Sequence, residues 1–101
     1  MSITSFIESI VSAAEAVRSA HGTPKERLSI ASRSLLPLVT EHLPERLPTD
    51  VKETFDDLRR RLRGFFSGDT FWSETEDSLA ARIKAFAKDL QERRASGELQ
   101  D

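Results

Sequence analysis

The sequence of 101 residues contains no cysteine and no tyrosine, and only four glycines, four prolines, two histidines and one tryptophan. Without cysteine, the chain has no means of forming a disulfide bond, a thiolate metal site or a cysteine nucleophile. The small numbers of glycine and proline, with the lack of tyrosine, argue against a turn-rich all-β fold. These absences favour a helical protein whose chemistry does not involve thiols.

Sequence motifs for catalysis and metal binding are also missing. Neither His21 nor His42 has a glutamate three residues before it, although di-iron helical bundles require that spacing. No serine lies in a G-x-S-x-G or S-x-x-K sequence, and no glycine-rich loop precedes a Lys-Ser or Lys-Thr pair. We therefore expect no enzymatic activity, no metal site and no cofactor.

Long apolar runs are absent as well. No stretch approaches the roughly 20 uninterrupted apolar residues that a membrane span requires. The N-terminal residues are interrupted by Glu8 and Glu15, unlike a secretory signal. The net charge of −2 and the pI near 5.7 do not favour general binding to nucleic acid or to an anionic membrane. We expect a cytoplasmic protein that does not bind membranes.

The composition that remains is typical of a small helical domain. Hydrophobic residues make up 38% of the chain and charged residues 32%. By length, the chain forms one domain with an ordinary single core. We expect residues 1–95 to form this domain and residues 96–101, which lack an apolar pattern, to fray.

Four stretches carry apolar residues at alternating spacings of three and four positions, which places them on one face of an α-helix. The expected helices cover about residues 2–20, 23–42, 50–67 and 73–94. Such faces pack against one another at shallow angles, and the short connections make neighbouring helices antiparallel. The sequence predicts an all-α protein, a small antiparallel four-helix bundle.

Several helix ends have recognisable signals. We expect Thr23, Asp50 and Ser73 to act as N-caps, because each is followed three residues later by a glutamate. Gly22 is expected to end the first helix in a left-handed conformation. These signals divide the chain into its four helical stretches.

The second helix contains a proline. Pro37 lacks a backbone donor, and its ring collides with the carbonyl of Arg33, so the helix is either kinked or split there. Because the apolar phase continues beyond Pro37, we favour a kinked helix that continues to about residue 42. The following connector contains Leu43 and Leu47, which we expect to be buried and to hold it against the core.

The third predicted helix combines an apolar face with a run of arginines. The residues of its apolar face are Val51, Phe55, Leu58, Leu62 and Phe65. At 100° per residue, Arg60 lies opposite this face and Arg63 well outside it, while Arg59 and Arg61 lie on its two flanks. The acids Asp56 and Asp57 are spaced to pair with Arg60 and Arg61.

Aromatic residues gather just after these arginines. Arginine beside exposed aromatic residues is the composition of interface hot spots. We therefore predict a non-catalytic protein–protein interaction or regulatory module. Its predicted partner-binding residues are Arg60, Arg63, Phe66, Phe71 and Trp72. For Phe71 and Trp72 we favour a second interpretation, in which they close the end of the bundle, because a small bundle has few ways to close its ends.

The sequence is also compatible with three other functions. The basic run from Arg59 to Arg63, with Phe71 and Trp72 stacking on bases, would suit a nucleic-acid-binding module. The broad apolar face of the first helix, which includes Phe6 and Val11, would suit a homodimer. A self-assembling structural subunit is the third alternative. Of these, we prefer a protein partner, whose identity the sequence does not reveal.

Overall fold

The computed structural model describes residues 1–19, 21–68 and 74–100, with only the backbone of Thr40. Within these residues there are four α-helices, one short 3-10 helix and no β-strand. The elements are α1 (Ile3–Arg18), α2 (Pro24–Leu35), η1 (Thr40–His42), α3 (Thr49–Ser67) and α4 (Glu76–Ala95). The prediction of an all-α fold is confirmed.

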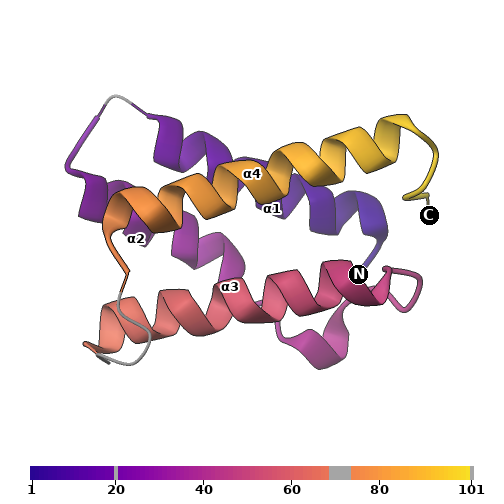
Figure 1. The fold of residues 1–101 in the computed structure, drawn as a ribbon, viewed down its shortest axis with the longest axis horizontal. Coiled ribbons are helices and arrows are strands. Elements are labelled where there is room, and N and C mark those ends of the chain that lie inside the picture. The colour runs from indigo at the N-terminus through magenta and orange to yellow at the C-terminus, as the bar shows by residue number, and fades with distance from the viewer. Residues whose placement is uncertain (20, 69–73, 101) are drawn as a thin grey trace.

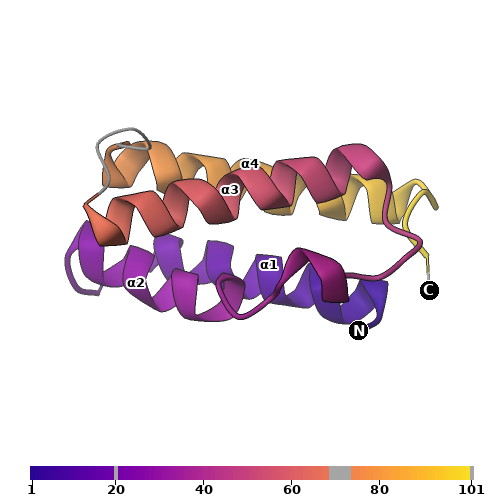
Figure 2. The ribbon, with the colours of Figure 1, turned by 90° about the horizontal axis from the view of Figure 1, so that it is seen from below.

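The four α-helices form a small antiparallel bundle. Consecutive helices run in opposite directions, and α1 with α2 forms one layer while α3 with α4 forms the other (Figure 2). Helix α1 packs against both α2 and α4, so it joins the two layers. Both chain termini lie at one end of the bundle, and the end of α3 and the start of α4 lie at the other (Figures 1 and 2).

Three phenylalanines tie the layers together at the centre of the core. Phe6 of α1 meets Phe55 of α3 edge-on, with ring centroids 5.2 Å apart. Phe86 of α4 lies 6.3 Å from each of them. Edge-to-face and offset contacts of this kind contribute about 0.5–1.5 kcal/mol beyond the burial of apolar area. Phe6 and Phe55 were expected on the apolar faces of their helices.

Helix α1 buries the residues that made its apolar face appear broad. Phe6 is fully buried, as are Ile10 and Ala13 of the same helix. Val11 is half-buried and packs against the same core. The bundle therefore covers most of this face within a single chain.

The end of α1 differs from the prediction. The helix stops at Arg18, and Ser19 has left the helical conformation. The Ser19 carbonyl accepts a hydrogen bond from Arg27 at 3.0 Å, which satisfies it without a glycine cap. Gly22 does have a positive φ of 79°, but it lies in the connection to α2. The prediction that Gly22 ends the first helix is therefore wrong.

Pro37 separates two helical segments. Helix α2 ends at Leu35, and the 3-10 helix η1 begins at Thr40. Our preference for a kinked helix that continues to residue 42 is wrong, and the alternative of a split is correct. Pro37 lacks the N–H that would donate to the Arg33 carbonyl in a continuous helix. The Leu36 carbonyl, at the end of α2, accepts a hydrogen bond from Arg59 of α3.

Leu43 and Leu47 hold the connector between η1 and α3. Both side chains are buried in the hydrophobic core, as predicted. The backbone between them turns through a hydrogen bond from the Leu47 N–H to the Pro44 carbonyl at 3.2 Å. The connector is thus held against the bundle at both ends, while Glu45 and Arg46 between them are exposed.

Two of the three predicted N-caps are wrong. Thr23 caps α2 as expected, accepting a hydrogen bond from the Glu26 N–H at 3.1 Å. Helix α3 begins after Pro48 without a side-chain cap, and Asp50 lies in its first turn. Helix α4 is capped by Thr75 rather than by Ser73, which lies outside the described residues.

The first turn of α3 is tied to the last turn of α4. Arg93 donates hydrogen bonds to Asp50, and it forms ion pairs with Asp89 at 3.0 Å and Glu98 at 3.1 Å. The hydrogen bond from Arg93 lowers the pKa of Asp50 below its ordinary value. Asp50 therefore joins two helices instead of capping one.

The chain after α4 turns back onto the bundle. Gly97 has a φ of 86°, its N–H donates to the Arg94 carbonyl, and the Glu98 N–H donates to the Arg93 carbonyl. This is the hydrogen-bond pattern of a Schellman motif. It carries Leu99 into the core, where the side chain is only 2% exposed. We expected residues 96–101 to fray and did not foresee the contact of Leu99 with the core. Asp101 lies outside the described residues.

The contact of Leu99 with the core has a measurable consequence. We expect Leu99→Ala to lower the free energy of unfolding by about 2 kcal/mol, the lower end for large-to-small core substitutions. Chemical denaturation measures this change, and Gln100→Ala, which alters an exposed neighbour, is the control. A loss below about 0.5 kcal/mol, as at exposed positions, would show that the terminal turn does not stabilise the fold.

Candidate functional site

The four arginines of α3 point in different directions, as their helical spacing predicts. Arg59 is buried, at 7% exposed, and Arg61 is partly buried. Arg60 and Arg63 are exposed, and the side chain of Arg60 is 62% accessible. The run therefore divides into two residues that hold the bundle together and two that face the solvent.

Arg59 connects α3 to the end of α2. Its Nη2 donates a hydrogen bond of 2.8 Å to the Leu36 carbonyl, one of the groups that a helix C-terminus leaves unpaired. Burial, and then repulsion from Arg63, lower the pKa of the guanidinium below its ordinary value. The group remains charged, since arginine does not deprotonate in proteins. Arg59 thus brings a positive charge into the interface between α2 and α3.

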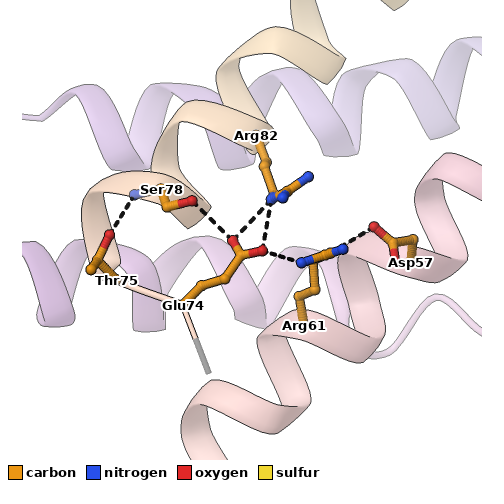
Figure 3. A network of polar contacts seen from close by, with 6 residues as sticks. All are labelled: Asp57, Arg61, Glu74, Thr75, Ser78 and Arg82. Carbon is orange, nitrogen blue, oxygen red and sulfur yellow. Dashed lines mark hydrogen bonds and ion pairs between the residues drawn. The ribbon is translucent and has the colours of Figure 1, made fainter. Parts of the chain in front are cut away.

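Arg61 connects α3 to the start of α4 through Glu74 (Figure 3). Its Nη1 donates to one carboxylate oxygen of Glu74, and its Nε donates to Asp57 at 2.7 Å. Arg82 donates to both Glu74 oxygens at 2.9 and 3.0 Å, and the Ser78 hydroxyl donates to one of them at 3.1 Å. The Glu74 carboxylate therefore joins two helices immediately before α4 begins.

The environment of Glu74 keeps it ionised. Its side chain is only 11% exposed, and burial alone would raise its pKa. The hydrogen bonds from Arg82, Ser78 and Arg61 outweigh burial and lower the pKa below the ordinary value of a glutamate. Glu74 therefore stays charged at neutral pH and accepts all of these bonds.

The outer side of α3 carries Arg60 and Arg63. Arg60 pairs with Asp56, one turn earlier, at 3.0 Å, as predicted. Exposed pairs of this type contribute little to stability, about 0.3–0.5 kcal/mol on a helix. Arg63 forms no ion pair with the part of the chain that the structure describes. Both guanidinium groups are accessible to a partner.

Phe66 extends this surface toward the end of α3. It is 38% exposed, and its ring meets Phe65 edge-on with centroids 5.0 Å apart. Phe65 was expected in the core, but it is only half-buried and packs at the core's edge. Phe71 and Trp72 lie outside the described residues. Of the five predicted partner-binding residues, the structure places Arg60, Arg63 and Phe66 at one end of α3.

Three residues with important contacts were not singled out by the sequence. The sequence grouped Arg59 with its neighbours in one basic run and assigned no contact to Glu74 or Arg93. Their long-range partners lie between 8 and 43 positions away along the chain. Local spacing contains no signal for contacts of this kind.

The residues that the structure describes contain no metal-binding cluster and no membrane-spanning helix. Among residues 1–19, 21–68 and 74–100, no three His, Cys, Asp or Glu side chains are grouped so that they could hold a metal ion. No helix in these ranges is sufficiently long and apolar to cross a membrane. Comparison of the chain with protein-family models, curated proteins and solved structures found no match.

The cluster around Glu74 predicts a specific dependence on pH. Because folding lowers the pKa of Glu74, the stability that its charge contributes is present above the pKa of an unfolded glutamate, about 4.5. This contribution is lost as the pH falls below that value and through the folded pKa. We expect Glu74→Gln to lower the free energy of unfolding at pH 7 by roughly 1–3 kcal/mol.

Denaturation at a series of pH values measures this effect. The difference between the native chain and Glu74→Gln should be constant near neutrality and shrink on acidification below about pH 4.5. Glu76→Gln removes a nearby acid from the first turn of α4 and serves as the control. A difference for Glu74→Gln that does not change with pH would mean that its charge does not stabilise the cluster.

Proposed function

We propose that this protein is a non-catalytic protein–protein interaction or regulatory module that binds its partner at the end of α3. The contact residues are Arg60, Arg63 and Phe66, with Phe71 and Trp72 from the residues that follow. The main support is the position of Phe66, which is an exposed large apolar side chain on the same helix end as two exposed arginines.

The chemistry of these residues suits a protein partner. Arginine and large aromatic residues dominate the binding energy of many interfaces, because they combine apolar contact with directed hydrogen bonds. Arg59 and Arg61 fix α3 on both flanks, so a partner would meet a preformed surface on a rigid helix. Little conformational entropy would then be lost on the side of this protein.

The nucleic-acid alternative has less support than the sequence suggested. Of the four arginines, Arg59 is buried against α2 and Arg61 is bound to two carboxylates. Only Arg60 and Arg63 of this run remain exposed to phosphate groups. Each phosphate contact adds to the affinity and to its salt dependence. Two contacts would therefore give weak binding whose affinity changes little with salt concentration. Measurement of binding to single-stranded RNA at increasing salt would test this alternative.

Self-association also has limited support. The apolar residues of α1 that suggested a homodimer are mostly buried against the other helices. Ile30 of α2 is 54% exposed, but its neighbours Glu26 and Arg33 are charged and exposed. The mass of the protein in solution would test both the homodimer and a self-assembling structural subunit. We also propose a cytoplasmic location, because a chain without cysteine suits a reducing compartment.

Charge reversal at the proposed surface should separate binding from folding. We expect Arg60→Glu with Arg63→Glu to abolish capture of the partner from an extract of the native cells. The melting temperature should change little, since surface substitutions contribute within about ±0.5 kcal/mol. Affinity capture with quantitative mass spectrometry, together with thermal unfolding, measures both effects.

The matched control places the same change of charge elsewhere. Lys88→Glu with Arg94→Glu alters two exposed cations of α4 and should leave partner capture intact. If the same proteins are captured by the α3 variant and the control, the end of α3 is not the contact surface. If both variants lose the partner, the effect reflects total charge rather than this surface.

A further inference from the structure

One flank of α3, from the buried Arg59 outward to the exposed Arg63, carries positive charge that the described residues only partly neutralise. Arg59, Arg63 and Phe66 follow one another at spacings of four and three, so they lie within about 60° around the helix axis. The hydrogen bond from Arg59 to the Leu36 carbonyl places the inner edge of this flank against the end of α2, while Arg63 and Phe66 are exposed. The three residues form one stripe, called here the Arg59–Phe66 stripe.

Arg59 is an unusual member of such a stripe because it is buried. Its Nε atom is shielded from solvent and has no hydrogen-bond partner among the described residues. A buried donor without a partner is unfavourable, and the penalty is larger for a charged group. Arg63 lies one helical turn away and repels Arg59, which adds to the effect of burial. An anion near this pair would therefore relieve an unfavourable positive potential.

The nearby acids leave this potential partly uncompensated. Among the described residues, Asp56 and Glu41 attract Arg59 through space, but neither forms an ion pair with it. Asp56 is bound to Arg60. In this region Arg59, Arg60 and Arg63 thus share the two acids Asp56 and Glu41. The overall net charge of the protein is −2. The local charge is opposite to that of the whole molecule, so it reflects the arrangement of this stripe.

We propose that the Arg59–Phe66 stripe binds an acidic segment of a partner protein. A carboxylate of that segment pairs with the exposed guanidinium of Arg63, where it also lies within the field of the buried Arg59. An apolar side chain of the same segment packs on Phe66. This inference rests on the proposed function and adds the chemical class of the partner.

An acidic peptide fits these observations better than a neutral or basic one. Arginine and carboxylate form charge-assisted, often bidentate hydrogen bonds, and these are the strongest that side chains make. A basic segment would add a third positive charge to Arg59 and Arg63. A neutral segment would bury the exposed part of Arg63 without an ionic partner, which costs free energy. Attraction by the local potential would also speed association with an acidic segment.

Selection from a displayed library of random peptides tests the proposal while the partner itself is unidentified. The intact protein, immobilised through its N-terminus, is the bait. We expect the enriched peptides to combine aspartate or glutamate with a nearby leucine or phenylalanine. Enrichment of neutral or basic peptides, or no enrichment above the background, would overturn the proposal.

The enriched peptides then allow a quantitative test by fluorescence anisotropy. Replacement of their acids by the corresponding amides should weaken binding at least about tenfold, equivalent to 1.4 kcal/mol. Arg63→Gln should cause a similar loss, while Lys88→Gln on α4 should cause none. Arg59 is left unchanged because it supports the end of α2. Equal binding by the acid and amide peptides would overturn the proposal.

Failure of this inference can be distinguished from failure of the proposed function. If no acidic peptide binds but charge reversal at Arg60 and Arg63 abolishes partner capture, the surface is correct and the partner class is wrong. If single-stranded RNA binds more tightly than any selected peptide, with a steep salt dependence, the partner is a nucleic acid and both proposals fail. If neither the peptide nor the capture experiment depends on Arg63, both proposals are also wrong.

Discussion

Helix α3 is held on both flanks by arginine side chains, and the character of the surface at its end depends on these contacts. Arg59 donates to the carbonyl of Leu36 at the end of α2, and Arg61 reaches the Glu74 carboxylate before α4. Each contact joins α3 to a different helix, so α3 has little freedom to rotate about its axis. The rotation in turn determines that Arg60 and Arg63 point away from the bundle. Four chemically identical side chains therefore acquire two different roles.

The two contacts differ in how fully the charges are satisfied. Around Glu74, two arginines and a hydroxyl surround one carboxylate, and Asp57 also pairs with Arg61. Around Arg59, one carbonyl is the only hydrogen-bond acceptor among the described residues, and the neighbour one turn along the same side is another cation. Breaking a nearly buried, fully paired cluster is costly, whereas adding an anion to an incompletely paired one is favourable. The first contact is therefore suited to stability, and the second leaves a preference for negative charge.

The parts of the fold that could be predicted are those that depend on local spacing. Phe6 and Phe55 were placed on the correct faces because the period of an α-helix is a property of the backbone. The Thr23 cap could be predicted because its hydroxyl accepts a hydrogen bond from the N–H of Glu26, only three residues later. The predictions of Asp50 and Ser73 as N-caps were wrong. Several polar residues near the start of each helix could act as its N-cap, and the path of the chain decides which one does. The role of Arg59 depends on where α2 ends, because its hydrogen bond goes to the Leu36 carbonyl at that end. The sequence around Pro37 did not decide whether the helix is kinked or split there.

The terminal turn around Gly97 also determines the geometry of attachment. Because Leu99 is anchored in the core, the chain leaves α4 beside the start of α1, at the pole opposite the end of α3 (Figures 1 and 2). The molecule is 36 Å long in its longest dimension. A label, a solid support or a neighbouring domain joined at either terminus would therefore stand away from Arg63 and Phe66. The bundle would act as a rigid spacer that presents this surface outward from its point of attachment.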